Sequence, residues 1–397
     1  MGHPPPPPTR LDSVDAYRGL VMLLIMFELL RFSAAVGKEG VHPIVSFLGY
    51  HQTHVEWVGC SLHDLIQPSF SFLVGVSLPY SLAARRAKGH GTLGLALHAF
   101  WRAFLLVMIG IVLRSFGEPI PDIGFTDTLS QIGLGYGFLF LLAFRPVRDQ
   151  WVAFGAILVG YWALFALWPL PGPEWDWARV GVKPEWLEQH GLTGFAAHWN
   201  KNANPAAAFD VWLLNLFPRQ SEFVFNRGGY ACLSFVPTLA TMILGLIAGG
   251  VLKGDRGGWA KVGWLTAAGV VALAAGWLLG EVGVCPVVKR IWTPSWVLFS
   301  GGWCFLLLAG FYAVNDVIGW RRWAFPLVVV GTNSIAAYCM SNSVVKPEIG
   351  RFVRRHFGLF LERIGPPYET AVAGAATVLL MWLILFWMYR RKVFIKV

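Results

Sequence analysis

The feature that most constrains this chain is a series of apolar blocks, each of about twenty residues. As a helix, a block of that length crosses the roughly 30 Å hydrocarbon core of a bilayer. Charged residues make up only 14% of the chain, whereas a soluble domain carries about a quarter. We expect an all-α, polytopic membrane protein with about ten spans. The expected spans are 17–35, 65–84, 95–114, 127–144, 151–169, 231–252, 260–280, 295–316, 325–343 and 367–389.

The basic residues indicate how the chain is threaded through the membrane. The formal net charge of +10 does not indicate a nucleic-acid partner, because Lys and Arg fall in short clusters between the apolar blocks. Clusters that begin at Arg85, Arg145, Lys253, Arg321 and Arg390 occupy alternate connections. Since cytoplasmic loops hold the excess of Lys and Arg, both termini are expected in the cytoplasm.

Three segments stand apart from the spans. The proline run 1–10 has no apolar core and is expected to be a disordered cytoplasmic tail, followed by one membrane domain over 11–397. The long segment 170–230 is expected outside the cytoplasm, where it caps a site. The segment 344–366 is also expected outside, although it is rich in Lys and Arg. Its apolar residues recur at helical spacing, which predicts an amphipathic helix in the outer interface.

The cysteines and histidines do not indicate a metal site. The five cysteines are scattered singly, with no CxxC spacing, and the histidines between 51 and 63 do not have the spacing of a zinc motif. We therefore expect no metal. Cys60 and Cys285 both fall in segments expected outside the cytoplasm, and sequence leaves open whether they form a disulfide.

The densest polar cluster lies between the first two spans, from His51 to Gln67. Polar groups near hydrocarbon are costly unless they pair or line a wet cavity, so such a cluster is a candidate functional site. Histidine carries protons near neutral pH, and a neighbouring carboxylate can hold its ring in one tautomer. The cluster offers His51, His54 and His63 as candidate proton carriers, with Glu56 and Asp64 as the carboxylates beside them. The simpler interpretation is a set of interfacial residues wetted by lipid headgroups.

Other polar residues interrupt the apolar blocks. Arg18 near the start of the first span is explained by anchoring on the cytoplasmic side, whereas Glu28 inside that span needs a partner. Gln131 interrupts the fourth span, and Asn333 with Ser334 interrupts the ninth. These residues either contact a ligand or hold helices together.

Lys289 and Trp292 mark the outer end of the eighth span. Aromatic and cationic residues gather at such ends without any catalytic role, and the mouth of a substrate site has the same composition. Both interpretations stay open on sequence alone.

Taken in order, these blocks resemble the heparan-α-glucosaminide N-acetyltransferase family, in particular its bacterial members of uncharacterised function. The opening signature of the family is similar to 13–19, and its His-x-x-Trp-x-Gly and Asp-x-x-x-Pro block is similar to 54–59 and 64–68. Nearly the whole chain is covered in the same order. Further segments similar to the family are 130–136, 235–245, 289–293 and 331–335.

The resemblance implies a transmembrane acetyltransferase that takes acetyl-CoA from the cytoplasm and acetylates an amino sugar on the opposite side. It implies His54 as the catalytic residue, and we then expect His54 to act as a base whose ring Asp64 or Glu56 orients. It also implies a bacterial inner membrane as the location. The lysosomal members have an asparagine late in the first span, where this chain has Glu28 and Leu29. The expected acceptor is therefore a bacterial envelope glycan and not heparan sulfate.

This mechanism requires a central cavity among the helices, because the thioester must cross most of the membrane to reach His54. Membrane lipid is an expected partner, and a homodimer is one option for the assembly. A transporter that uses the polar cluster from His51 to Asp64 is the main alternative, followed by a non-catalytic envelope protein. The residues expected to contact acetyl-CoA are Arg18, Gln131, Asn333 and Ser334. The residues expected to contact the acceptor are Glu28, Trp57, Gln67, Lys289 and Trp292.

Overall fold

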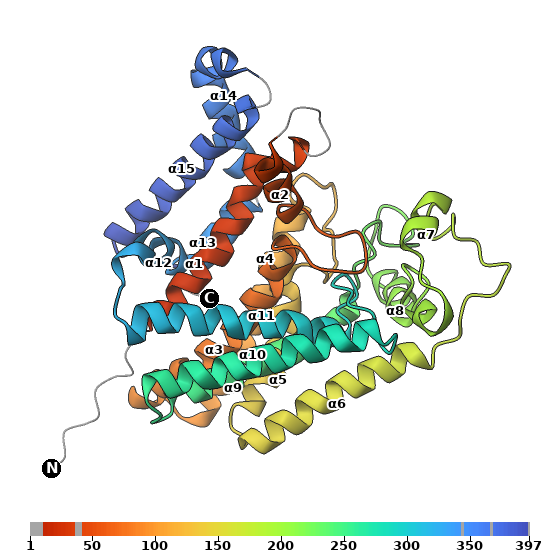
Figure 1. Cartoon of the computed structure of the whole chain (residues 1–397), viewed down its shortest axis with the longest axis horizontal. Helices are drawn as coiled ribbons and strands as arrows, with labels where there is room; N and C mark the ends of the chain where they lie inside the picture. The colour runs from red at the N-terminus through yellow and green to blue at the C-terminus, as the bar shows by residue number, and fades with distance from the viewer. Residues whose placement is uncertain (1–10, 36–41, 343–344, 366–367, 396–397) are drawn as a thin grey trace. The chain divides into compact units, whose positions relative to one another are not determined.

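The computed structural model describes residues 11–35, 42–342, 345–365 and 368–395, and these are helical with irregular connections (Figure 1). The expected tail 1–10 lies outside the described residues. The chain forms two compact units, which are described separately. The larger unit contains residues 56–59 and 67–309, and the smaller unit contains 11–55, 60–66 and 310–397.

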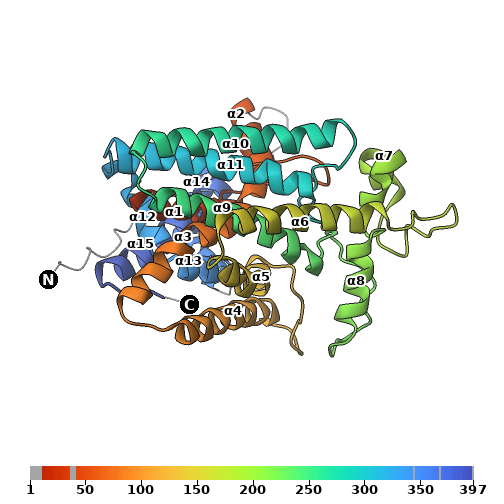
Figure 2. The ribbon, with the colours of Figure 1, turned by 90° about the horizontal axis from the view of Figure 1, so that it is seen from below.

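Long apolar helices build most of the larger unit, and Figure 2 shows α10 running alongside α11. Its central helix is α9, which is buried along most of its length. A Cβ at Gly245 of α9 would lie 1.9 Å from the carbonyl oxygen of Phe72, so glycine allows α9 and α3 to pack backbone to backbone. The helices are α3 (Ile66–Ala87), α4 (Thr92–Ser115), α5 (Thr128–Leu142), α6 (Val147–Ala166), α9 (Phe235–Lys253), α10 (Gly258–Glu281) and α11 (Pro294–Tyr312).

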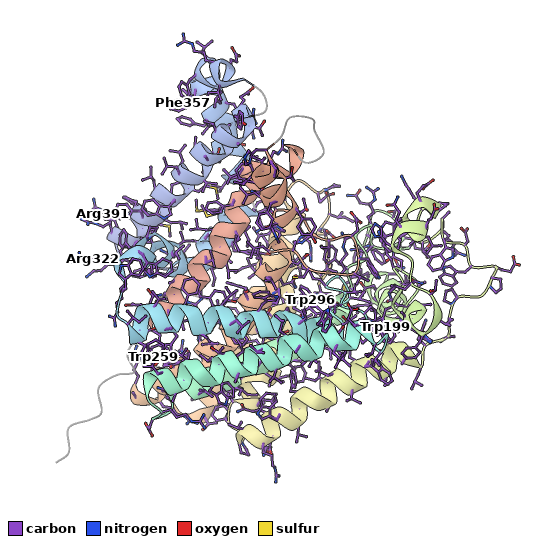
Figure 3. The ribbon with its side chains drawn as sticks, viewed as in Figure 1. Trp199, Trp259, Trp296, Arg322, Phe357 and Arg391 are labelled. Carbon is purple, nitrogen blue, oxygen red and sulfur yellow. The ribbon has the colours of Figure 1, made fainter. Side chains whose placement is uncertain are left out.

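The segment between α6 and α9 folds into a small aromatic layer, which includes Trp199 (Figure 3). It contains α7 (Pro184–His190) and α8 (Pro205–Leu214). The indole of Trp57 is buried in this layer and donates a hydrogen bond to the carbonyl oxygen of Trp199 at 3.0 Å. The expected long segment 170–230 is therefore ordered by a core that it shares with α6 and with residues 285–291.

Close helix packing also organises the smaller unit. A Cβ at Gly19 of α1 would lie 1.9 Å from the carbonyl oxygen of Leu327, and one at Gly331 would lie 1.8 Å from that of Asp15. Glycine at both positions lets α1 and α12 touch along their backbones. The helices are α1 (Asp12–Phe27), α2 (Pro43–His51), α12 (Phe325–Gly331), α13 (Ser334–Ser341), α14 (Val345–Ile364) and α15 (Tyr368–Arg390).

The described residues contain seven helices that are long and apolar enough to cross a membrane. The chain is therefore an integral, polytopic membrane protein of helical class. An eighth span forms if α12 and α13 count as one, although a 66° bend separates them. The remaining two expected spans correspond to α1 with 16 residues and α5 with 15, which are short for a full crossing. The total of about ten spans stays a prediction.

Helix α14 follows the spacing that the sequence indicated for 344–366. Val353 and Leu361 are buried and pack with Ala373 of α15. Phe357 on the same helix is 51% exposed, and Phe360 is 61% exposed (Figure 3). The apolar residues of α14 thus lie both on the face packed against α15 and on the exposed surface, while the place of the helix in the outer interface stays a prediction.

Candidate active site

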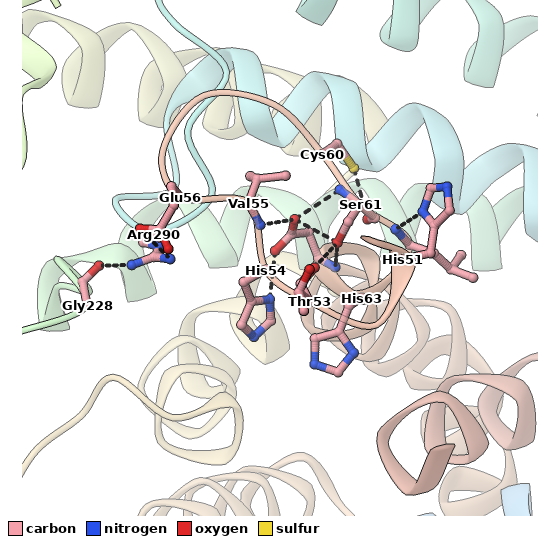
Figure 4. A network of polar contacts seen from close by, with 12 residues as sticks. His51, Thr53, His54, Val55, Glu56, Cys60, Ser61, His63, Gly228 and Arg290 are labelled. Atoms are coloured by element: carbon pink, nitrogen blue, oxygen red, sulfur yellow. Dashed lines mark hydrogen bonds and ion pairs between the residues drawn. The ribbon is translucent and has the colours of Figure 1, made fainter. Parts of the chain in front are cut away.

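A histidine–carboxylate pair lies in the smaller unit, where the loop after α2 turns back on itself before α3 begins. His54 Nδ1 is 2.7 Å from Asp64 Oδ1 (Figure 4). The Asp64 side chain is 1% exposed, whereas that of His54 is 36% exposed. The carboxylate is therefore held inside the protein while the imidazole remains accessible to a substrate.

Asp64 is held by several donors from its own loop. The backbone N–H groups of Val55 and Ser61 donate to Asp64 Oδ2 at 3.2 and 3.0 Å. A carboxylate surrounded by donors is stabilised in its ionised form, which only accepts hydrogen bonds. Nδ1 of His54 must then carry a proton, and in the neutral ring the lone pair is on Nε2. This is the tautomer that a general base requires.

A second histidine–carboxylate pair lies beside the first in the same unit. His63 Nε2 is 2.8 Å from Glu28 Oε1, and Lys346 Nζ is 3.1 Å from Glu28 Oε2. The ring centroids of His54 and His63 are 4.5 Å apart. The carboxylate of Glu28 thus has two cationic or hydrogen-bonding partners, which answers the need for a partner that its position in the sequence implied.

Glu56, the other carboxylate expected near His54, is engaged in the larger unit. Its Oε2 is 3.7 Å from Arg290 and accepts a hydrogen bond from the indole of Trp186 at 3.4 Å. Lys201 Nζ lies 4.9 Å from the centre of the Trp186 ring. Burial lowers the pKa of Lys201, and the positive charge of Arg290 lowers it further. Of the two candidate carboxylates, Asp64 is the one that orients His54.

Two residues expected to contact ligands are brought together in the larger unit. Gln67 Nε2 donates to Gln131 Oε1 at 3.1 Å, and the hydroxyl of Thr238 donates to the same oxygen at 3.0 Å. The amide nitrogen of Gln131 donates to the carbonyl oxygen of Ala231. The amide of Gln131 is 3% exposed, so these contacts favour helix association over a ligand contact.

The other residues expected near acetyl-CoA lie in the smaller unit. Arg18 pairs with Asp15, one turn before it on α1, at 3.3 Å. Asn333 is fully buried, donates to the carbonyl oxygen of Val393 and accepts from the backbone N–H of Ile395. Ser334 begins α13 and is half-buried. The hydrogen bonds of Asn333 hold Val393 and Ile395 against the bend between α12 and α13.

The aromatic and basic residues expected at a substrate mouth are buried in the larger unit. Trp57 is 1% exposed, Lys289 is 4% exposed and Trp292 is 2% exposed. The indole of Trp292 donates to the hydroxyl of Thr241 at 3.2 Å. These side chains support the surrounding backbone in the described state, so substrate contact by them needs a rearrangement.

Among the described residues, the cysteines form no disulfide and the potential metal ligands form no group. All five cysteines, including Cys60 and Cys285, are thiols in the described part of the chain. Across the described residues, no group of three or more His, Cys, Asp or Glu side chains is placed to hold a metal ion.

Comparison with known proteins agrees with the order of the motifs. No family model matches the chain. The human heparan-alpha-glucosaminide N-acetyltransferase is 24% identical over 98% of this chain, and the mouse protein of the same name is 22% identical over 98%. The chain is similar to the heparan-alpha-glucosaminide N-acetyltransferases over almost its whole length. This confirms the resemblance that the motifs indicated. The chain spans 60% of the length of these curated relatives.

Sequence reasoning did not assign the partners of Glu28. His63 was visible inside the polar cluster, but nothing in the spacing joined it to a residue in the first span. Lys346 lies 318 residues from Glu28, so local patterns could not pair them. The available signal was the basic character of 344–366, which a segment expected outside the cytoplasm did not explain.

Proposed function

We propose that this protein is a transmembrane N-acetyltransferase that moves the acetyl group of acetyl-CoA to the amine of a sugar. The observation that carries this proposal is the pair of His54 and Asp64, an oriented imidazole that is accessible on one side. The similarity to named acetyltransferases over 98% of the chain supports it, because the motif that supplies His54 is one of those that resemble the family.

His54 acts as the general base in the proposed reaction. Nε2 takes a proton from the acceptor amine while the amine nitrogen attacks the thioester carbonyl carbon, and a tetrahedral oxyanion forms. The carbon–sulfur bond then breaks, and His54 returns the proton to the departing sulfur as it becomes the thiol of CoA. Asp64 stays ionised and stabilises the imidazolium between the two steps. An acetyl-histidine intermediate at His54 is the alternative route.

The proposal includes a direction across the membrane. Acetyl-CoA enters from the cytoplasm, and the acceptor glycan is on the far side of a bacterial inner membrane. About ten transmembrane helices surround a central cavity that connects the two sides. Both termini lie in the cytoplasm. The alternating basic clusters support this orientation, and the segment 170–230 then covers the outer entrance.

Acetyl transfer by the purified protein in detergent tests the activity. Radiolabelled acetyl-CoA is supplied with glucosamine, and acetylated sugar is measured for wild type, His54→Ala and His51→Ala. His51 is the matched control, because it is a neighbouring histidine whose Nδ1 accepts a hydrogen bond from the backbone N–H of Leu62. We expect His54→Ala to lose about 10²- to 10⁴-fold in rate while still binding acetyl-CoA, and His51→Ala to lose little. Equal losses, or turnover by His54→Ala at the wild-type rate, refute this role.

Proteoliposomes test the direction. Acetyl-CoA is placed on one side of the membrane and the acceptor on the other, and the product is measured on the acceptor side. We expect product only when acetyl-CoA faces the side that carries the chain termini. Movement of acceptor or proton without acetylation contradicts this proposal and indicates a transporter.

A further inference from the structure

The second histidine–carboxylate pair has no role in the reaction described so far. His63 lies behind His54, with a side chain 8% exposed against 36% for His54. Their ring centroids are 4.5 Å apart, which is direct contact between two imidazoles. The carboxylate of Glu28, which accepts from His63, is 38% exposed. His63 therefore contacts both His54 and the carboxylate of Glu28.

The inference rests on the proposed function. Acetyl transfer to an ammonium ion requires two proton acceptors, and His54 can hold only one proton at a time. An aliphatic amine arrives near neutral pH largely as its ammonium form, R–NH₃⁺. The overall reaction converts R–NH₃⁺ and acetyl-CoA into the acetamide, the thiol of CoA and one free proton. Two protons leave the nitrogen, and the sulfur takes up only one. The first proton must leave before the amine can attack.

We propose that His63 stores this first proton while His54 handles the second. His54 Nε2 accepts the first proton from the ammonium and passes it to Nδ1 of the adjacent His63 ring. His54 is then neutral again and can accept the second proton during the attack. Nε2 of His63 already donates to the carboxylate of Glu28, so Nδ1 is the nitrogen with the lone pair that receives the proton. His63 acts through His54 and is a positioning residue.

The charges around His63 allow it to hold a proton and then to release it. The carboxylate of Glu28 faces His63 directly and balances the imidazolium while the proton is held. The ammonium of Lys346 binds the other oxygen of Glu28 at 3.1 Å and weakens that balance, so the proton is released again. In the described part of the chain, the other titratable groups seen in contact with His63 and Glu28 are His54 and Lys346. The proton leaves Nδ1 through His54 after the product departs, which restores the tautomer of His63 that donates to Glu28.

The experiment compares two acceptors whose amines differ in protonation at the same pH. At about pH 6 glucosamine is an ammonium ion, whereas methoxyamine is already a neutral amine. We expect His63→Asn to lose at least about tenfold in kcat with glucosamine and less than about threefold with methoxyamine. At about pH 9, where glucosamine is also neutral, the loss with glucosamine should shrink to that with methoxyamine. His54→Ala should lose activity with both acceptors at both pH values.

Lys346→Met supplies a second, independent measurement, which stands even where His63→Asn fails to fold. Removing the ammonium leaves the charge of Glu28 to hold the proton on His63 more strongly, so the proton is released more slowly. The kcat with glucosamine at about pH 6 should fall, and the kcat with methoxyamine should not change.

Each outcome decides the matter. Equal losses of kcat with the two acceptors, in either His63→Asn or Lys346→Met, refute the proton store and leave a structural role for His63. Full activity of His63→Asn with glucosamine at about pH 6 also refutes it. Absence of turnover by wild type with either acceptor refutes the proposed function, and the store with it.

Discussion

Replacing Asp64 by asparagine removes the charge that orients His54 and keeps nearly the same shape. An amide at this position has one acceptor oxygen and one donor group, whereas the carboxylate accepts on both oxygens. The backbone N–H groups of Val55 and Ser61 converge on Asp64 Oδ2, and His54 Nδ1 lies on Oδ1. If the amide NH₂ faces His54, it meets the Nδ1–H donor. If it faces the backbone, it meets the N–H donors of Val55 and Ser61.

The magnitude follows from two separate losses. Each buried donor left without an acceptor costs about 1–3 kcal/mol of stability. For catalysis, an amide NH₂ facing His54 favours the tautomer with the proton on Nε2, which cannot act as a base. The expected loss in kcat is about 10³-fold, equivalent to about 4 kcal/mol of transition-state stabilisation. Binding of acetyl-CoA should change little, since Asp64 acts through the ring.

The assay is steady-state acetylation of glucosamine, with acetyl-CoA binding and thermal unfolding measured on the same preparations. Glu56→Gln is the matched control, because Glu56 is a carboxylate two residues from His54 whose side chain is 56% exposed and pairs with Arg290. We expect Glu56→Gln to keep kcat within about threefold of wild type. If folded Asp64→Asn keeps kcat, or if Glu56→Gln loses as much, the tautomer argument is wrong.

Three further predictions concern the frame around the site. Burial raises the pKa of Asp210 to about 7, so its stabilising contribution is complete below the unfolded pKa of about 4 and is lost as pH rises through about 7. The free energy of unfolding should fall by up to about 4 kcal/mol over this range in chemical unfolding, and Asp210→Asn should remove this pH dependence. Gly331→Ala should lower the unfolding temperature, because its Cβ would meet the carbonyl oxygen of Asp15 at 1.8 Å, whereas Gly350→Ala meets nothing within 4 Å and should be neutral or stabilising. Trp57→Phe should destabilise by about 1–3 kcal/mol in chemical unfolding, because the carbonyl oxygen of Trp199 loses a buried donor. An unchanged pH series in Asp210→Asn, equal effects of the two glycine substitutions, or unaltered unfolding of Trp57→Phe would each contradict the corresponding argument.

The helical class and the position of most spans could be predicted because length and hydropathy act locally. A block of about twenty apolar residues satisfies its own backbone hydrogen bonds as a helix, whatever lies next to it. The bend between α12 and α13 could not be predicted in the same way. The polar residues there, Asn333 and Ser334, interrupt an apolar block, but only the contacts of Asn333 with Val393 and Ile395 show what the interruption does.

In the candidate site too, local contacts could be predicted from the sequence and long-range contacts could not. His54 and Asp64 are ten residues apart in one loop, so a sequence cluster was enough to bring them together as candidates. Gln131 and Trp292 could equally have been ligand contacts or internal ties, because an amide or an indole is chemically suited to both. The difference lies in which partners occupy their polar atoms, and those partners come from other helices.

Lys346 shows how a departure from a local rule can indicate a long-range contact. A basic segment on the side expected to be outside the cytoplasm is costly for orientation unless its charges serve another purpose. One of those charges pairs with Glu28, the carboxylate that lacked a partner in the first span. Each residue is unexplained in its own stretch of sequence, and each accounts for the other in the fold. A cation that violates the orientation rule and an acid in or beside an apolar span are therefore a pair to test together, and in this chain that pair leads directly to His63.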